Sequence, residues 1–235
     1  MKKKLWLIIG ICVAVLLVAG AVLYFAAFRP KQLANAEHKR QVELYRENKK
    51  QQYLAENEQY DDYEVDVAFI GDSLTDGYDL KKYYPQFVTA NRGIGGDTTF
   101  DLEGRLQVAV YDLKPKVVVM LIGANNMDTM MENYESILQG LRDNLPETKI
   151  VLLSLTAMGG AHWGSKNQLA AYNNVTIKLL AEKYGYTFID LYTPLYDVNT
   201  REVYEGYTID GGHFTHEGYT VLMLVRHLQQ FLSCS

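Results

Sequence analysis

The stretch Val65-Asp66-Val67-Ala68-Phe69-Ile70-Gly71-Asp72-Ser73-Leu74 joins a short apolar run to a polar turn. Residues 65–70 are rich in β-branched and aromatic side chains, which predicts a buried β-strand. The Gly-Asp-Ser turn ends this strand and leaves a serine hydroxyl beside its carboxyl end. Parallel sheets bind ligands at that edge, so the residues that follow each strand are the first candidates for a functional site.

The alternation of apolar runs and helical spacing continues along the chain. Further strands are predicted at 117–122, 150–155 and 186–189, with a weaker fifth strand at 87–90. Between them, apolar residues at helical spacing predict helices over 102–113, 134–145, 174–184 and 217–232. Apolar strands separated by helices are typical of a parallel sheet covered on both faces, so the expected fold class is three-layer α/β/α.

The composition is that of a globular protein with an uneven division of charge. The 235 residues include 23 Lys and Arg, 28 Asp and Glu, two Cys and 48% hydrophobic residues. This excludes a disordered chain, a collagen-like repeat and a disulfide-stapled miniprotein. Residues 1–50 hold ten basic and three acidic side chains, and the remainder holds 13 basic and 25 acidic ones. An acidic globular part is a poor partner for nucleic acid, because phosphate binding needs clustered Lys and Arg.

Residues 1–29 form a candidate membrane anchor. The uncharged run from Leu5 to Phe28 reaches roughly 36 Å as a helix, enough to cross a hydrocarbon core of ~30 Å. A cleaved signal peptide is the alternative, but its apolar region normally has only about 7–15 residues. We therefore expect a single-pass protein of a bacterial cell membrane with its C-terminal domain outside. Basic residues flank both ends of the run, so the positive-inside rule leaves this orientation open.

Residues 30–62 are a charged segment that links the anchor to the globular part. The segment is dense in Lys, Arg, Glu, Gln and Asn, and it has no Gly and no Pro after Pro30. Its apolar residues are too sparse for a core-facing stripe, so we predict a solvated helical stalk, with a short coiled coil as the alternative. The globular domain is expected to cover residues 63–235.

Four short polar motifs follow the predicted strands or precede the last predicted helix. They are Gly71–Thr75, Asn91–Thr99, Gly123–Asn126 and Asp210–His213. Each has an ordinary structural interpretation, as a helix cap, a glycine turn, an Asn turn or a local Asp–His contact. Together, in a fold that gathers strand ends, they supply a hydroxyl, backbone N–H donors, an amide and an Asp–His pair. Acyl transfer requires this set of groups.

The four motifs, in this order and spacing, resemble those of the SGNH/GDSL hydrolase family. The likeness is to its lysophospholipase L1-like and platelet-activating-factor-acetylhydrolase-like esterases, and it covers residues 65–232. It implies the SGNH hydrolase fold, in which a five-stranded parallel sheet has flavodoxin-like order. By position, the resemblance implies Ser73 as nucleophile, His213 as general base and Asp210 as the residue that orients the base.

The same resemblance implies an oxyanion hole formed by Ser73, Gly96 and Asn125. One position departs from the family pattern, because Asn126 stands where many relatives have Asp. Since the catalytic amide is assigned to Asn125, this departure concerns the geometry of the turn more than the chemistry.

Three further residues are candidate substrate contacts. Asp72 lies beside the implied nucleophile, and His162 and Trp163 lie in the loop 157–168. That loop follows a predicted strand, and it is either a wall of the acyl site or an ordinary surface loop. A second histidine, His216, competes for the role of base, although its spacing to the preceding Asp does not match DxxH.

The resemblance implies a membrane-anchored serine esterase that hydrolyses small acyl esters, such as an acetyl ester of a glycan or a lysophospholipid-type ester. An O-acyltransferase that uses the same acyl-enzyme to modify a cell-surface sugar is the alternative, and a non-catalytic tethered binding module is another. We expect no cofactor and no metal ion, because the five His form no HExxH pattern and the two Cys form no CxxC pair. Acyl length, the alcohol part and oligomeric state stay open.

Overall fold

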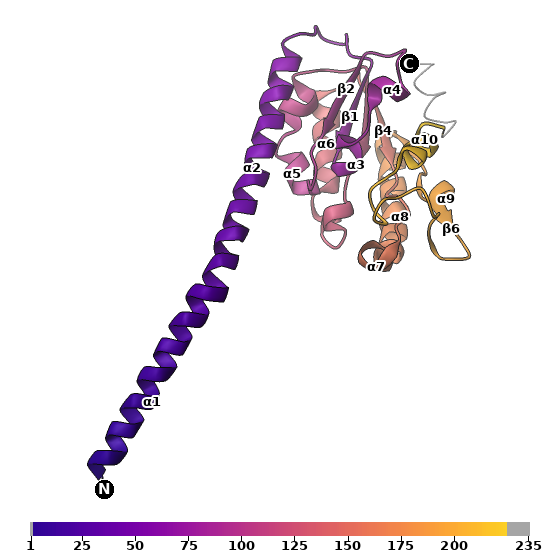
Figure 1. The fold of residues 1–235 in the computed structure, drawn as a ribbon. Helices are drawn as coiled ribbons and strands as arrows, with labels where there is room; N and C mark the ends of the chain where they lie inside the picture. The colour runs from indigo at the N-terminus through magenta and orange to yellow at the C-terminus, as the bar shows by residue number, and fades with distance from the viewer. Residues whose placement is uncertain (1, 225–235) are drawn as a thin grey trace. The chain divides into compact units, whose positions relative to one another are not determined.

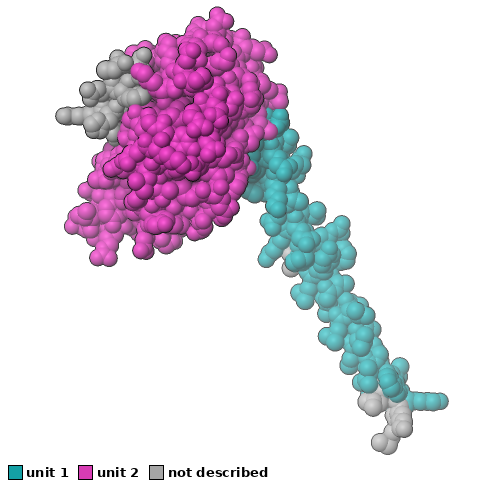
Figure 2. All heavy atoms as spheres, turned by 180° about the vertical axis from the view of Figure 1, so that it is seen from behind, with its two compact units in different colours: residues 1–49 teal, residues 50–235 magenta. Residues whose placement is uncertain are grey.

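A computed structural model of the chain describes residues 2–224. The chain divides into two compact units, residues 1–49 and 50–235, which are coloured separately in Figure 2.

The N-terminal unit is helical throughout the residues described. Helix α1, Lys2–Leu23, continues through a π-helical turn, Tyr24–Phe28, into α2, Arg29–Asn57. The wider turn has a local cause, because Pro30 has no N–H to donate to the preceding turn of helix. Within residues 2–224, one helical stretch, which begins at Trp6, contains an 18-residue window apolar enough to cross a membrane, with a mean hydropathy of 2.9. A signal sequence would meet the same criterion.

Five parallel strands form the sheet of the second unit (Figure 1). They lie in the order β2-β1-β3-β4-β5, and each neighbouring pair is parallel. Their bounds are β1 Val67–Gly71, β2 Thr89–Gly93, β3 Val117–Leu121, β4 Lys149–Leu153 and β5 Thr187–Ile189. This confirms the predicted flavodoxin-like sheet and places the carboxyl ends of β2, β1 and β3 side by side.

Alternate side chains of the strands enter two separate cores, one on each face of the sheet. In β1, Ala68 and Ile70 join the first core, whereas Val67 and Phe69 join the second. The first core is completed by α5 (Thr99–Glu103), the π-helical turn η2 (Gln107–Tyr111), α6 (Tyr134–Asn144) and α8 (Asn167–Tyr184). The second is completed by α3 (Ser73–Asp76), α4 (Leu80–Tyr83), α9 (Tyr192–Leu195) and α10 (His216–Leu224). The three-layer α/β/α architecture is therefore confirmed.

Short elements complete the fold at the edge of the sheet that carries the strand ends. They are the 3-10 turns η3 (Ala124–Asn126), η4 (Met130–Glu132) and η5 (Gly164–Lys166), the helix α7 (Gly160–Trp163), and the hairpin of β6 (Tyr196–Asp197) and β7 (Glu202–Val203).

The weakest predicted strand is displaced towards the C-terminus. It was expected at 87–90, but β2 extends to Gly93 and includes two polar residues. Asn91 donates its amide hydrogens to the carbonyl oxygens of Thr75 (2.7 Å) and Tyr78 (3.0 Å). Arg92 is fully buried and forms an ion pair with Glu56. A hydropathy pattern misses this strand because its polar side chains are satisfied by partners distant in the sequence.

Three predicted helices differ in extent from the observed ones. The helix predicted over 174–184 begins earlier, because α8 starts at Asn167. The helix predicted over 102–113 is interrupted: Thr98 forms a reciprocal cap with Asp101 at the start of α5, but α5 ends at Glu103 and the next helical turn, η2, begins at Gln107. Gly104 follows α5 directly and forms its C-terminal cap, in which its N–H donates to the carbonyl oxygens of Phe100 and Leu102. For the helix predicted over 217–232, α10 accounts for residues up to 224, and residues 225–232 lie outside those described.

The second unit begins at Lys50, upstream of residue 63, where the globular domain was expected to start. The reason is Tyr53, whose side chain is only 1% exposed and whose ring lies 4.6 Å from the guanidinium carbon of Arg92. An isolated tyrosine in a charged helix produces no apolar stripe, so periodicity does not reveal this contact.

Candidate active site

The end of β1 places the Gly-Asp-Ser turn at the middle of the sheet. A Cβ atom on Gly71 would lie 2.1 Å from the carbonyl oxygen of Leu121 on β3, so only glycine allows the strands to stay this close before the turn. Asp72 then caps α3 by accepting the N–H of Leu74 at 3.1 Å. As a result, Ser73 is the first residue of α3 and remains partly exposed.

Three predicted site residues from distant parts of the chain form one hydrogen-bonded series. The Ser73 Oγ lies 3.0 Å from Nε2 of His213, and the His213 Nδ1 lies 2.8 Å from Oδ2 of Asp210. Asp210 also accepts the backbone N–H groups of Gly212 (3.0 Å) and His213 (2.8 Å) through its other oxygen. A hydroxyl in contact with an imidazole that is oriented by a carboxylate is the geometry of an activated nucleophile.

The electrostatics of Asp210 suit the role of orienting a base. The backbone N–H of His213 is the largest influence, and together with the imidazole and the Gly212 N–H it lowers the pKa of Asp210 to about 2. The carboxylate is therefore ionised at neutral pH. It favours the imidazole tautomer with its proton on Nδ1, which leaves Nε2 able to accept the proton of Ser73.

The rival histidine points elsewhere. His216 is exposed, and its Nδ1 contacts the hydroxyl of Tyr83 and lies 3.4 Å from the Nζ of Lys82. Among the described residues, the histidine that the structure places in contact with Ser73 is His213.

The turns after β2 and β3 bring the other predicted residues to the same edge. Gly96 has a φ of +79°, a conformation that favours glycine, and it is exposed. Asn125 is also exposed and donates one amide hydrogen to the carbonyl oxygen of Asp97 at 2.9 Å. An Asn amide has two hydrogens, so the second is available to a substrate oxygen.

Asn126, the position that departs from the family pattern, has a structural role in this chain. Its Oδ1 accepts the N–H of Thr99 at 3.1 Å, and its Nδ2 donates to the Thr99 hydroxyl at 2.9 Å. The amide thus links the turn after β3 to the start of α5, and it preserves the turn that carries Asn125.

A buried ion pair beneath these turns was missed by the sequence analysis. Arg105 and Asp97 are 5% and 1% exposed, and Nε of Arg105 lies 2.7 Å from Oδ2 of Asp97. The guanidinium also donates to the carbonyl oxygens of Arg92 (2.9 Å) and Gly71 (3.0 Å). The available signal was an arginine next to the apolar face predicted for residues 102–113, with an acidic residue in the glycine-rich turn before it.

Asp72 is not placed to touch a substrate, contrary to the expectation from the sequence. Its side chain is 1% exposed and lies beneath the turn, where one carboxylate oxygen caps α3 and the other has no hydrogen-bond partner among the described residues. Burial, with a smaller effect of the Asp97 charge, raises the pKa of Asp72 to about 7.

The loop 157–168 is anchored beside the Asp–His pair. The N–H of Gly159 donates to the carbonyl oxygen of Gly211 at 2.8 Å, and the ring of Trp163 stands perpendicular to that of His213 with 6.1 Å between centroids. His162 is exposed and packs edge-on against Trp163. Trp163 therefore forms a wall next to the His213 imidazole, whereas His162 contacts Trp163.

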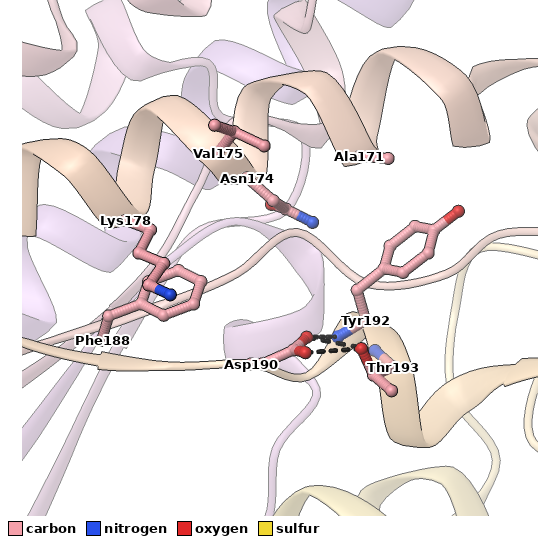
Figure 3. Close-up of a pocket in the computed structure, with 8 residues that line it drawn as sticks. All are labelled: Ala171, Asn174, Val175, Lys178, Phe188, Asp190, Tyr192 and Thr193. Carbon is pink, nitrogen blue, oxygen red and sulfur yellow. Dashed lines mark hydrogen bonds between the residues drawn. The ribbon is translucent and has the colours of Figure 1, made fainter.

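A separate surface pocket lies between α8 and the end of β5, with a volume of about 220 Å³ (Figure 3). Its lining residues are Ala171, Asn174, Val175, Lys178, Phe188, Asp190, Tyr192 and Thr193. The Asp190 carboxylate is occupied locally, because it accepts the N–H groups of Tyr192 (2.8 Å) and Thr193 (3.1 Å) and the Thr193 hydroxyl. None of the predicted site residues lines this pocket. Within residues 2–224, no group of three or more His, Cys, Asp or Glu side chains is arranged to hold a metal ion.

Comparison with known sequences points to one family. Residues 69–221 match the model of the GDSL-like lipase/acylhydrolase family. The chain is 36% identical over 107 residues to the platelet-activating factor acetylhydrolase IB subunit alpha2 of Homo sapiens and of Rattus norvegicus. That alignment covers 42% of this chain and 47% of the relative, so the chain spans about half the length of the curated relatives it matches.

Solved structures with the same fold include two with 25% sequence identity. A protein from Streptococcus pneumonia described as a platelet activating factor has a TM-score of 0.75, and the match covers 86% of this chain and 99% of that protein. A protein from Bacteroides fragilis described as an acylhydrolase has a TM-score of 0.69, and the match covers 78% of this chain and 95% of that protein. The match to the family model extends over more than half of the chain and includes Ser73, Asn125, Asp210 and His213. The chain belongs to the GDSL-like lipase/acylhydrolase family.

Proposed function

We propose that this protein is a membrane-anchored serine esterase that hydrolyses short acyl esters through an acyl-enzyme on Ser73. The observation that carries the proposal is the series of contacts from Ser73 through His213 to Asp210, with distances of 3.0 Å and 2.8 Å. A serine held this way in a partly exposed position has the access and the base that acyl transfer needs.

In the first half-reaction, Nε2 of His213 takes the proton of Ser73 as its Oγ attacks the carbonyl carbon of the ester. The imidazolium is stabilised by the ionised Asp210 carboxylate. His213 then returns the proton to the alcohol oxygen as the bond between the carbonyl carbon and that oxygen breaks. The alcohol leaves, and the acyl group remains on Ser73.

The negative charge on the carbonyl oxygen is received by three donors in this proposal: the backbone N–H of Ser73, the backbone N–H of Gly96 and the side-chain amide of Asn125. Ser73 is the first residue of α3, so its N–H has no acceptor within that helix. Losing one such donor typically lowers kcat by about 10²–10³-fold. In the second half-reaction, His213 deprotonates a water molecule, which attacks the acyl carbon. The imidazolium then returns this proton to the Ser73 Oγ as the bond between the acyl carbon and Oγ breaks, which releases the carboxylic acid and restores Ser73.

Three observations support the proposed substrate class. The apolar helix that begins at Trp6 supports an anchor, which would keep the domain close to esters at a membrane or cell surface. The name of the related acetylhydrolases supports a short acyl group, and the wall formed by Trp163 beside His213 is consistent with a confined acyl or alcohol site. We therefore assign short acyl esters of a surface glycan or lysophospholipid-type lipid as the substrate class.

The test is hydrolysis of p-nitrophenyl esters from acetyl to dodecanoyl by the full chain in detergent, with Ser73→Ala as the blank. We expect the highest kcat/KM for acetyl and loss of activity with chain length. Rising activity towards long chains would overturn the short-acyl assignment, and no difference from the blank would overturn the esterase. Adding a sugar acceptor distinguishes the acyltransferase, because an acylated sugar would then form at the expense of free acid.

Membrane anchoring has its own test. Cells expressing the full chain are fractionated, and the membrane fraction is washed with carbonate at high pH. We expect the chain to stay with the membranes at its full length, whereas a shortened chain in the soluble fraction would show a cleaved signal sequence.

A further inference from the structure

The end of α2 is joined to the sheet by contacts that point towards the active site. The Tyr53 hydroxyl donates to the carbonyl oxygen of Gly93 at 2.6 Å. Glu56 forms an ion pair with Arg92, and Asn57 accepts a second guanidinium hydrogen of Arg92 at 2.9 Å. All these contacts lie within the second compact unit, and they meet the last two residues of β2.

Because Arg92 is buried, its charge depends on these contacts for compensation. Its side chain is fully buried, and Glu56 is the carboxylate that pairs with it among the described residues. A buried guanidinium without its counter-ion is strongly unfavourable, so the position of β2 depends on α2. The other carboxylate oxygen of Glu56 accepts an amide hydrogen of the exposed Gln52 at 2.8 Å, which orients the carboxylate.

From the end of β2, the contacts continue to the candidate oxyanion donors. Arg105 binds the carbonyl oxygens of Arg92 and Gly71 and the carboxylate of Asp97 at 2.7–3.0 Å. Gly71 directly precedes the Asp72–Ser73 turn, and Asp97 directly follows Gly96. The carbonyl oxygen of Asp97 in turn accepts the amide of Asn125.

We propose that the last two turns of α2, residues 50–57, are a positioning element of the active site, acting through Arg92 and Arg105 on the oxyanion turn. This inference rests on the proposed function, because positioning is meaningful only if Gly96 and Asn125 bind an oxyanion. None of Tyr53, Glu56 and Arg105 touches the substrate in this scheme. Their effect is on the placement of the donors, which must match the position where charge develops.

The test compares Glu56→Gln and Tyr53→Phe in the full chain with Glu58→Gln, a matched control. Glu58 is exposed, directly follows α2 and makes no side-chain hydrogen bond or ion pair with the described residues, so its neutralisation should leave kcat unchanged. Active sites are counted by stoichiometric reaction of Ser73 with a fluorophosphonate, and kcat is expressed per counted site. This readout separates misplaced donors from a smaller folded fraction.

We expect Glu56→Gln to lower kcat per active site about five- to tenfold with KM within twofold, and Tyr53→Phe to lower it by about twofold to threefold. The pH profile should not move, since His213 and Asp210 are untouched. A melting temperature that falls while kcat per active site stays at the wild-type value in both variants would overturn the inference. If Glu56→Gln does not fold, Tyr53→Phe decides alone. Failure of the proposed function is distinct, because the wild type itself would then neither hydrolyse esters nor react with the fluorophosphonate.

Discussion

The two halves of the proposed active site are held in place in different ways. The nucleophile half sits on the ends of β1, β2 and β3, above the Arg105–Asp97 pair, whose side chains are almost fully buried. In the base half, the side chains of Asp210 and His213 are 47% and 44% exposed, and they bond chiefly to each other across three residues. The first half is positioned by contacts spread through the core, whereas the second is a local arrangement with few attachments.

This difference predicts how many catalytic groups a single substitution displaces. A change in the core under the nucleophile half should shift several oxyanion donors together, because Arg105 contacts three segments at once. A change in the base half should act on one side chain and leave the donors in place. The following variants separate the two cases.

The largest effect is expected from removal of the base. His213→Ala leaves Ser73 without a proton acceptor, and we expect kcat to fall by at least about 10³-fold. His216→Ala is the control, since that imidazole contacts Tyr83 and Lys82, and it should keep kcat within a few-fold of wild type. Steady-state hydrolysis of p-nitrophenyl acetate measures both. The reverse pattern would show that the base has been assigned to the wrong histidine.

The next effect concerns a single oxyanion donor. We expect Asn125→Ala to lower kcat by about 10²–10³-fold with little change in KM, because the amide acts mainly on charge that develops in the transition state. Asn126→Ala removes the neighbouring amide, which binds only Thr99 and Thr129 in the described structure, and should cost stability rather than chemistry. Equal losses of kcat in the two variants would mean that the turn, and not the Asn125 donor, is what matters.

A smaller effect is expected where the base half is attached to the loop 157–168. Gly211 has a φ of +90°, and a Cβ atom there would lie 1.9 Å from the carbonyl oxygen of Gly159. Gly211→Ala should therefore displace the Asp210–His213 loop and lower kcat by about tenfold, a typical cost of misplacing a catalytic group.

Gly206→Ala is the matched control for that clash. Gly206 has nearly the same φ, +89°, but no atom lies within 4 Å of a Cβ built there. It carries only the backbone cost of a left-handed alanine, about 1–2 kcal/mol, so it should lower the melting temperature and leave kcat unchanged. If both variants lose the same activity, backbone strain and not the contact with Gly159 fixes the loop.

The same contrast explains which features the sequence predicted. The sheet follows from apolar runs, and the Asp210–His213 pair follows from a spacing of three residues, so both are visible in local patterns. Arg92, Arg105 and Tyr53 are buried by partners that are distant in the sequence, and their residue types are ordinarily exposed or half-buried. Periodicity therefore hides them, and it also hides the start of the compact unit at Lys50.

The residues of the candidate site also differ in how well the sequence predicts them. Ser73, Gly96, Asn125, Asp210 and His213 are all indicated by motifs. The structure brings Ser73, His213 and Asp210 into contact and places Gly96 and Asn125 in the turns after β2 and β3. Asp72 was selected for its place beside Ser73, but the motif does not tell whether a side chain points outward or beneath the turn. The capping bond to Leu74 decides that question, and only the three-dimensional structure shows it.

The smallest predicted effect concerns Asp72. Asp72 is buried and Asp210 is exposed, so their environments differ in the same way as those of the nucleophile half and the base half. Asp210 is exposed and accepts two N–H groups, which with the imidazole lower its pKa to about 2, whereas burial beneath Ser73 raises the pKa of Asp72 to about 7. Between the ordinary value of 3.8 and about 7, the folded state holds a proton on Asp72 that the unfolded chain has lost. Stability must therefore fall as pH rises through this window, by at most about 1.4 kcal/mol per pH unit from this group.

Asp72→Asn tests this directly, because the amide keeps an oxygen that can accept the Leu74 N–H while removing the charge. Thermal unfolding followed by circular dichroism between pH 4.5 and 8 should show a wild-type melting temperature that declines more steeply than that of the variant. The variant should be the more stable protein at pH 8. Parallel curves would mean that Asp72 ionises as readily in the folded protein as in the unfolded chain, so that burial does not raise its pKa. In that case the electrostatic contrast between the two halves would rest on the Arg105–Asp97 pair alone.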